Sequence, residues 1–180
     1  LLNNKSGVSI ATMHMSCYEL VPFAVQSLIG QATTLSKIPP FIKNATDIYH
    51  QANITVINKN QQHSLIKLLQ TTKTNAAICL HADHYARDVD VTFFNRQTSA
   101  PSGPAAISAY SKSPLLIAYP ILQSNNRYKV IIETLVDTHV GSSTGEISHA
   151  MQCIYHRFEE IISANANQWY WSYNRWREVK

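Results

Sequence analysis

Residues 8–30, VSIATMHMSCYELVPFAVQSLIG, indicate the fold class most clearly, because a short apolar run leads through a turn into a helical pattern. Val8 to Met13 predicts a short buried strand. The helical segment begins near Cys17 and ends at Gly30, with Pro22 where the first turn of a helix tolerates proline. A strand that runs directly into a helix is one step of the alternation typical of α/β proteins.

The same alternation continues through the rest of the chain. Further strands are predicted at 32–35, 54–57, 76–82, 115–122 and 128–135, and further helices at 38–52, 61–72, 104–111 and from the Ser143–Glu146 capping box onward. Residues 83–104 predict a loop-rich segment with a short strand at 91–94. The last two strands, joined by QSNNR, predict a hairpin. We therefore expect an α/β fold with a mixed, largely parallel central sheet and helices on both faces.

Composition narrows the class of protein without naming a partner. The chain has 180 residues, of which 45% are apolar, as expected for one globular domain. Its net charge of +4 suits an anionic lipid surface, an acidic protein or nucleic acid. Cys17, Cys79 and Cys153 lack paired spacing, which argues against a disulfide scaffold or zinc ribbon and fits a reducing compartment. No apolar run approaches the roughly 20 residues of a membrane span.

The clearest candidate for chemistry is the pair His14 and Glu19, at the carboxyl end of the first strand and the start of the first helix. Ligands bind at this edge of open α/β sheets. A carboxylate on one imidazole nitrogen would leave the other as a general base facing the cleft. The alternative is a structural histidine tied to a helix-capping glutamate, and the spacing alone leaves both open.

The surrounding blocks extend this pattern in order along the chain. HMSCYE resembles the H-x4-D/E motif of the lysophospholipid acyltransferase superfamily, and more narrowly HFGNWE of the bacterial lipid A biosynthesis acyltransferases. LSKIPP, AAICLHADHYARDVDVTFFNR, APSGPAAIS, YKVIIE and NQWYWSYNRW are similar to later blocks of that family. They place Lys37, Asp83, Arg96, Ser102 and Gly103 on family positions, and the resemblance runs from His14 to Trp176.

The resemblance implies a glycerol-3-phosphate/lysophospholipid acyltransferase-like fold and acyl transfer. The donor would be acyl carrier protein or acyl-coenzyme A, and the acceptor a hydroxyl of a lipid or glycolipid. The protein would work without a cofactor, peripheral to the cytoplasmic face of the bacterial inner membrane. We expect one acyltransferase domain, residues 1–180, without an N-terminal membrane-anchoring segment.

By the same resemblance, His14 would be the general base and Glu19 its orienter. Lys37 and Arg96 would hold acceptor phosphate or polarise the acyl carbonyl. Ser102 and Gly103, just before a helix, would present backbone N–H groups to an anion. Asp83 would be a further substrate-binding residue.

Departures from the family pattern motivate two other hypotheses. Met15-Ser16-Cys17-Tyr18 replaces Phe-Gly-Asn-Trp, and the loop after Asp83 has no glycine. A catalytically altered lipid-binding or scaffold homologue is the first alternative. The second is a thioesterase that uses Cys17 with His14. Ser102 as a hydrolase nucleophile ranks lower, because the G-x-S-x-G elbow is missing.

Two further features have less specific interpretations. His81, Asp83 and His84 resemble a metal-ligand set, but on a strand His84 would point away from the other two, so we expect no metal. The C-terminal tail combines three tryptophans with arginines. We expect some of these aromatic side chains to contact a membrane interface and some of the tryptophans to close the core. The chain lacks a basic stripe, so we expect no nucleic acid.

Overall fold

The computed structural model describes residues 7–37, 46–59, 64–74 and 76–177. The strands are β1 (Val8–Thr12), β2 (Ala32–Ser36), β3 (Thr55–Asn58), β4 (Ala77–His81), β5 (Val89–Phe93), β6 (Arg96–Ala100), β7 (Leu115–Leu122) and β8 (Tyr128–Val136). The helices are α1 (Leu20–Ile29), α2 (Asp47–Gln51), α3 (Ser64–Thr71), α4 (Gly103–Ser111) and α5 (Thr144–Ala164), with the 3-10 turns η1 (Thr72–Thr74) and η2 (Ala166–Gln168).

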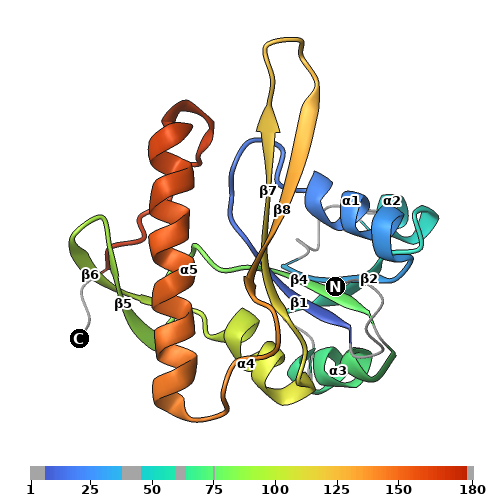
Figure 1. Cartoon of the computed structure of the whole chain (residues 1–180). Helices are drawn as coiled ribbons and strands as arrows, with labels where there is room; N and C mark the ends of the chain where they lie inside the picture. The colour runs from blue at the N-terminus through green and yellow to red at the C-terminus, as the bar shows by residue number, and fades with distance from the viewer. Residues whose placement is uncertain (1–6, 38–45, 60–63, 75, 178–180) are drawn as a thin grey trace.

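Six strands form the central sheet in the order β3-β2-β4-β1-β7-β8. All neighbouring pairs are parallel except β7 and β8, which form the predicted antiparallel hairpin. Helices cover both faces of this sheet (Figure 1). The predicted α/β class with a mixed, largely parallel sheet is therefore confirmed.

Successive side chains of β1 point to opposite faces of the sheet and pack into two different hydrophobic clusters. Val8 and Ile10 pack with the α1 side, whereas Ala11 belongs to the cluster that α4 and α5 complete. Ser9, on the same face as Ala11, donates its hydroxyl to the Pro104 carbonyl at 2.7 Å. A strand buried on both faces needs an almost unbroken run of apolar or small residues, which VSIAT supplies.

Helix α5 follows the predicted capping box. The Ser143 hydroxyl accepts the Glu146 N–H, and the Glu146 carboxylate accepts the Ser143 N–H. The buried residues of α5 include Met151, Ile154 and Phe158 at helical spacing. The predicted helix at 38–52 corresponds to the short α2, since residues 38–45 lie outside the described part.

The segment predicted as mostly loop contains a second, two-stranded sheet. β5 and β6 pair antiparallel through a two-residue turn, Phe94-Asn95, and both turn residues have positive φ. Gln152 on α5 bonds both the N–H and the C=O of Thr92, and Glu159 accepts the Phe94 N–H at 2.6 Å. Helix α5 thus holds this hairpin, which Figure 1 shows lying next to α5. The expectation of a single short strand here was wrong, because β6 is also formed.

The carboxyl ends of β1, β2 and β4 lie at one edge of the sheet because these strands are parallel. His14 follows β1, Lys37 follows β2 and Asp83 follows β4. Topology therefore places three residues that are far apart in the sequence at one edge of the sheet, the edge where open α/β sheets bind ligands.

Candidate active site

His14 lies in the turn between β1 and α1, and two backbone contacts hold that turn. The Tyr170 N–H donates to the His14 carbonyl at 2.9 Å, and Met15 forms an isolated antiparallel bridge with Trp169. Ser16 turns the chain with a φ of 48°. The C-terminal segment thus runs across the turn and presents the imidazole, whose side chain is 12% exposed.

The carboxylate partner of His14 is Asp83. Nδ1 of His14 lies 2.6 Å from Oδ1 of Asp83, and the His14 backbone N–H donates to Oδ2 at 3.0 Å. An ionised carboxylate only accepts hydrogen bonds, so Nδ1 carries the hydrogen of this pair. In the neutral imidazole Nε2 is then the unprotonated nitrogen, with a lone pair that can accept a proton.

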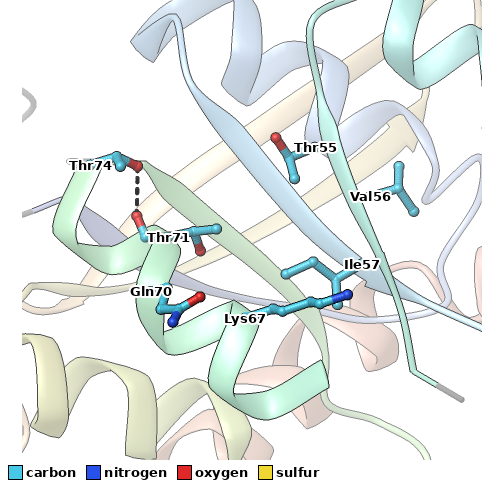
Figure 2. Close-up of a pocket in the computed structure, with 7 residues that line it drawn as sticks. All are labelled: Thr55, Val56, Ile57, Lys67, Gln70, Thr71 and Thr74. Atoms are coloured by element: carbon cyan, nitrogen blue, oxygen red, sulfur yellow. Dashed lines mark hydrogen bonds between the residues drawn. The ribbon is translucent and has the colours of Figure 1, made fainter. Parts of the chain in front are cut away.

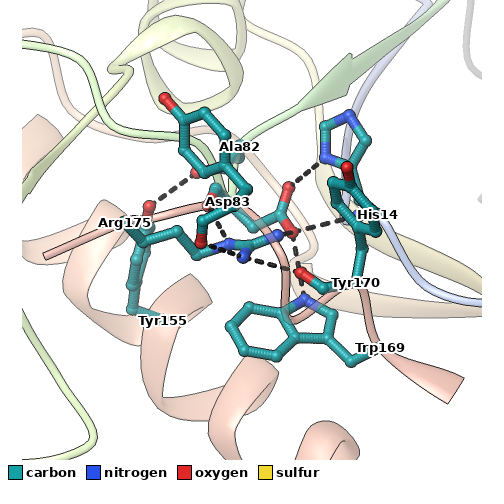
Figure 3. Close-up of polar contacts among 8 residues, drawn as sticks. His14, Ala82, Asp83, Tyr155, Trp169, Tyr170 and Arg175 are labelled. Atoms are coloured by element: carbon teal, nitrogen blue, oxygen red, sulfur yellow. Dashed lines mark hydrogen bonds and ion pairs between the residues drawn. The ribbon is translucent and has the colours of Figure 1, made fainter.

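Arg175 compensates the charge of Asp83 inside the protein. Its Nη2 lies 3.1 Å from Asp83 Oδ2 and its Nε donates to the Asp83 carbonyl at 2.7 Å. Trp169 donates its indole N–H to the same Oδ2 at 3.1 Å, and the Arg175 guanidinium lies 3.9 Å from the Trp169 ring centroid. Figure 3 shows these groups converging on the carboxylate.

Asp83 is fully buried and Arg175 is 1% exposed, so neither charge is solvated. Burial by itself raises the pKa of Asp83, but the hydrogen bond and charge of His14, with the charge of Arg175, hold that pKa well below its usual range. The carboxylate is therefore ionised at any physiological pH. Because Arg175 already pairs with it, the negative charge stays compensated while His14 is neutral.

Arg175 also ties the C-terminal segment together. Its Nη1 donates to the carbonyls of Tyr170 and Tyr173 at 2.8 and 3.0 Å. Tyr155 of α5 donates its hydroxyl to the Ala82 carbonyl at 2.7 Å, next to Asp83 (Figure 3). The segment that follows α5 is thus built into the site.

Two further imidazoles surround His14. The His84 ring stacks on the His14 ring, with centroids 3.8 Å apart and planes 2° from parallel, and Tyr173 covers the other side of His84 at 4.0 Å. The His81 ring lies 4.5 Å from that of His14, and Tyr18 approaches both edge-on. This aromatic stack limits how far the His14 ring can turn.

His81 and His84 are neutral at physiological pH. Burial lowers the pKa of His81 to about 3, and burial followed by the charge of His14 lowers the pKa of His84 to about 4. Nδ1 of His81 and Nε2 of His84 are buried without a hydrogen-bond partner among the described residues. His14, the imidazole with a carboxylate partner, thus lies next to two uncharged imidazoles.

Glu19 lies at the N-cap of α1 and is exposed. Its carboxylate accepts the hydroxyl of Tyr49, a residue of α2. Loss of hydration raises the pKa of Glu19, and the charge of His14 partly offsets the rise. Glu19 is thus an electrostatic neighbour of His14, and its predicted role as the orienting group stays a prediction.

The two predicted cationic residues occupy different places. Lys37 is exposed at the carboxyl edge, directly after β2. Arg96 is exposed at the start of β6, in the second sheet, with its guanidinium 5.3 Å from the Trp176 ring centroid. Lys37 shares the edge of His14, whereas Arg96 belongs to the β5–β6 hairpin.

Ser102 and Gly103 begin α4, where an anion site was predicted. The Ser102 N–H donates to Oδ2 of Asp88 at 3.0 Å, so the protein supplies an anion of its own there. A Cβ on Gly103 would lie 3.1 Å from a methyl of Leu80, which explains a small residue at this position by packing. Their role in substrate binding stays a prediction.

His14, Asp83 and His84 each offer one ligand atom, and these atoms lie within 4.8 Å of one another. These three residues differ from the set that the sequence suggested, His81, Asp83 and His84. However, the stacked rings of His14 and His84 direct their in-plane lone pairs along parallel planes, so the lone pairs do not converge on one ion. Both oxygens of Asp83 also have partners already. This geometry favours proton transfer over metal binding.

Two cavities lie elsewhere. One of about 430 Å³ lies between edge strand β3 and helix α3 (Figure 2), lined by Thr55, Val56, Ile57, Lys67, Gln70, Thr71 and Thr74. Another of about 520 Å³ lies between the end of β8 and the start of α5 and includes His149 and Cys153. Neither of the two includes His14 in its lining.

Of the two roles predicted for the C-terminal tryptophans, closing the core is confirmed, and the membrane-interface contact stays a prediction. Trp169 is buried, and Trp176 is partly buried with its indole N–H on the Phe93 carbonyl, whereas Trp171 is 55% exposed. Two of the three therefore close the core and one faces solvent. Among the described residues, no helix is long and apolar enough to cross a membrane.

Comparisons with known proteins identify the family of this chain. No curated protein matches the chain significantly. The sequence model of the bacterial lipid A biosynthesis acyltransferases matches residues 1–178, which is nearly the whole length. This protein therefore belongs to the bacterial lipid A biosynthesis acyltransferase family, a family of membrane-associated lipid metabolism.

Proposed function

We propose that this protein transfers a fatty acyl chain from an acyl thioester to a hydroxyl group of a lipid or glycolipid acceptor. The donor is acyl carrier protein or coenzyme A carrying the chain. The family supports acyl transfer to a lipid. The observation that carries the mechanism is the 2.6 Å contact between His14 Nδ1 and Asp83, because it leaves Nε2 as the basic nitrogen.

His14 Nε2 takes the proton of the acceptor hydroxyl as that oxygen attacks the thioester carbonyl carbon. The new C–O bond forms, the C–S bond breaks, and His14 returns the proton to the leaving thiolate. The reaction consumes no oxidant or reductant. Such a base contributes typically about 10²–10⁴-fold to rate.

Asp83 acts as the positioning residue of His14. It fixes the tautomer, and its negative charge stabilises the imidazolium that forms when Nε2 is protonated. Arg175 and Trp169 hold the carboxylate so that it does not turn away. Because Asp83 is fully buried, we assign it to positioning the base and not to contacting substrate.

Lys37 and Arg96 remain proposed contacts for acceptor phosphate or for the acyl carbonyl oxygen. Lys37 is supported by its exposure at the edge where His14 lies. A cation there favours the negative charge that develops on the carbonyl oxygen. We place the reaction at the cytoplasmic face of the inner membrane, with the protein in peripheral contact.

The test is acyl transfer by the wild type beside His14→Ala. Both donor thioesters, radiolabelled in the acyl chain, are offered with a panel of lipid acceptors. His156→Ala is the matched control, because His156 is an exposed histidine of α5. We expect His14→Ala to lose transfer by about 10²–10⁴-fold and His156→Ala to match wild type.

The labelled product identifies the acceptor, and the consumed thioester identifies the donor. Transfer that survives in His14→Ala would overturn the mechanism. A wild type that consumes neither donor would favour the lipid-binding or scaffold hypothesis.

A further inference from the structure

The β7–β8 hairpin extends past the edge of the sheet where His14 lies. Ala118 is the last residue of β7 paired with β1, opposite Thr12. Tyr119 to Leu122 continue beyond it, which adds roughly 13 Å at about 3.3 Å per residue. Figure 1 shows this hairpin projecting from the molecule next to the C-terminal end of α5.

Gln168 joins the hairpin to the C-terminal segment. Its side-chain carbonyl accepts the Leu122 N–H at 2.8 Å, and its amide donates to the Leu122 carbonyl at 3.2 Å. Two residues later, the Tyr170 N–H bonds the His14 carbonyl. The hairpin, the segment 168–171 and the turn that carries His14 are therefore consecutive parts of one region.

Large apolar side chains in this region face solvent. Leu122 and Tyr128, which pair directly across the hairpin, are 40% and 47% exposed, and Tyr170 and Trp171 are 51% and 55% exposed. The indole N–H of Trp171 is already bonded to the Ala166 carbonyl at 2.7 Å, which holds its ring in place. Tyrosine and tryptophan combine an apolar ring with a polar group, as side chains at a membrane–water interface do.

The formal charges of the hairpin tip and of the C-terminal segment are all positive. Arg127 and Lys129 are exposed on the hairpin. No aspartate or glutamate occurs in residues 119–132 or 161–177. Basic residues beside exposed aromatic rings fit the headgroups of anionic lipids together with the upper part of the acyl layer.

We propose that the hairpin surface, defined as Leu122, Arg127, Tyr128, Lys129, Tyr170 and Trp171, docks the protein on an anionic lipid bilayer. This docking proposal rests on the proposed function, because the bilayer holds the lipid acceptor. Contact through this surface turns the sheet edge with His14 toward the lipid headgroups. An acceptor hydroxyl can then reach His14 while its acyl chains stay in the bilayer.

The test measures binding to vesicles without any acyl donor, so its result does not depend on acyl transfer. The wild-type protein is sedimented with vesicles of phosphatidylcholine alone and with phosphatidylcholine vesicles that contain about 30% phosphatidylglycerol. The variants are Tyr128→Ser with Trp171→Ser, and Arg127→Gln with Lys129→Gln. Tyr110→Ser and Ile66→Ser are controls, because these side chains are 73% and 52% exposed on α4 and α3.

We expect wild type to bind the anionic vesicles more tightly than the neutral ones. The basic double variant should lose roughly tenfold or more of its affinity for the anionic vesicles only. The aromatic double variant should lose affinity for both kinds, and the two controls should match wild type. His14→Ala should also bind vesicles like wild type, which separates docking from catalysis.

Equal binding by wild type and both double variants would overturn the proposal, and so would a wild type that binds neither kind of vesicle. If binding is equal, an acyl-transfer assay on the same variants tests whether an acidic protein is the partner of this surface. In that case vesicle binding is unchanged in the variants, but transfer from acyl carrier protein falls while transfer from acyl-coenzyme A does not. That outcome also overturns docking on the bilayer. Circular dichroism and melting curves show that each variant is folded.

Discussion

Two carboxylates lie beside His14, and they stand in opposite environments. Glu19 is five residues away in the sequence, is exposed, and accepts the hydroxyl of Tyr49. Asp83 is 69 residues away, is fully buried, and bonds His14, Trp169 and Arg175. Closeness in sequence brings Glu19 near the base, but parallel pairing of β1 with β4 supplies the carboxylate that touches it.

The difference shows how this protein holds a charge beside a base. A buried carboxylate without partners would be strongly disfavoured and would take up a proton. Arg175 and Trp169 remove that cost, so Asp83 can remain an anion next to a neutral imidazole. An exposed carboxylate such as Glu19 is screened by water and has a weaker effect on its neighbours.

Asp83→Asn should have the largest effect on activity. We expect kcat to fall by about 10²–10⁴-fold, because the amide neither enforces the Nδ1–H tautomer nor stabilises the imidazolium. The measurement is steady-state acyl transfer at a temperature where melting curves show that the variant is folded. Asp137→Asn, at an exposed aspartate, is the control and should be neutral. A loss below about threefold in Asp83→Asn would assign the orienting role elsewhere.

Removing the cation that compensates the charge of Asp83 should lower the stability of the folded protein. We expect Arg175→Met to lower the free energy of unfolding by about 3–5 kcal/mol, because a buried carboxylate then lacks its partner. Urea denaturation at neutral pH measures this change. Arg96→Met removes an exposed arginine that also lies on a tryptophan, so it should cost less than about 1 kcal/mol. Similar losses in the two variants would mean that burial of the ion pair is unimportant.

The neutral imidazoles make stability depend on pH. The pKa of His81 falls from 6.5 in the unfolded chain to about 3 in the folded protein, foremost because of burial. Its contribution is therefore fully present above about pH 6.5 and is lost as the pH falls toward 3. Between pH 7 and pH 5 we expect His81→Gln to lose on the order of 2 kcal/mol less than the wild type, because His84, with a pKa of about 4, makes a similar contribution in both proteins. Urea unfolding at the two pH values compares them, and parallel losses would contradict a neutral buried His81.

Glu19→Gln should have the smallest effect. We expect kcat to change by less than about threefold and stability by less than about 1 kcal/mol, because the amide can still accept the Tyr49 hydroxyl at an exposed position. The same acyl-transfer assay measures it beside Asp83→Asn. A loss of about a hundredfold or more in Glu19→Gln would reverse the comparison and make Glu19 the orienting carboxylate.

Local patterns predicted most of the fold. The β1, β2, β4, β7 and β8 strands and helix α4 were expected close to their observed bounds, as were the end of α1 at Gly30 and the start of α5 at its capping box, because each has a clear period or a clear start or stop signal. Helix α1 begins at Leu20, three residues later than expected. Strand β6 was missed because RQTSA has little apolar alternation and its turn, Phe94-Asn95, lacks the glycine typical of two-residue hairpins. Contacts with α5 hold that hairpin, and these are tertiary.

The candidate site was predicted in part. His14 was identified at a strand end, and Asp83 was identified by resemblance as a site residue. The partnership of His14 with Asp83, the compensating charge of Arg175 and the stack of His84 were missed. The one available signal was an aspartate directly after a buried strand, since such a residue needs a partner once it is covered.

An α/β chain with His14 at the carboxyl end of its first strand follows from local pattern, because hydrophobic periodicity and capping act over a few residues. Which carboxylate contacts that histidine, and how its charge is compensated, depends on long-range packing. Asp83 reaches His14 through strand pairing, and Arg175 reaches Asp83 through the fold of the C-terminal segment. Such contacts depend on the packing of distant segments, which no local pattern records.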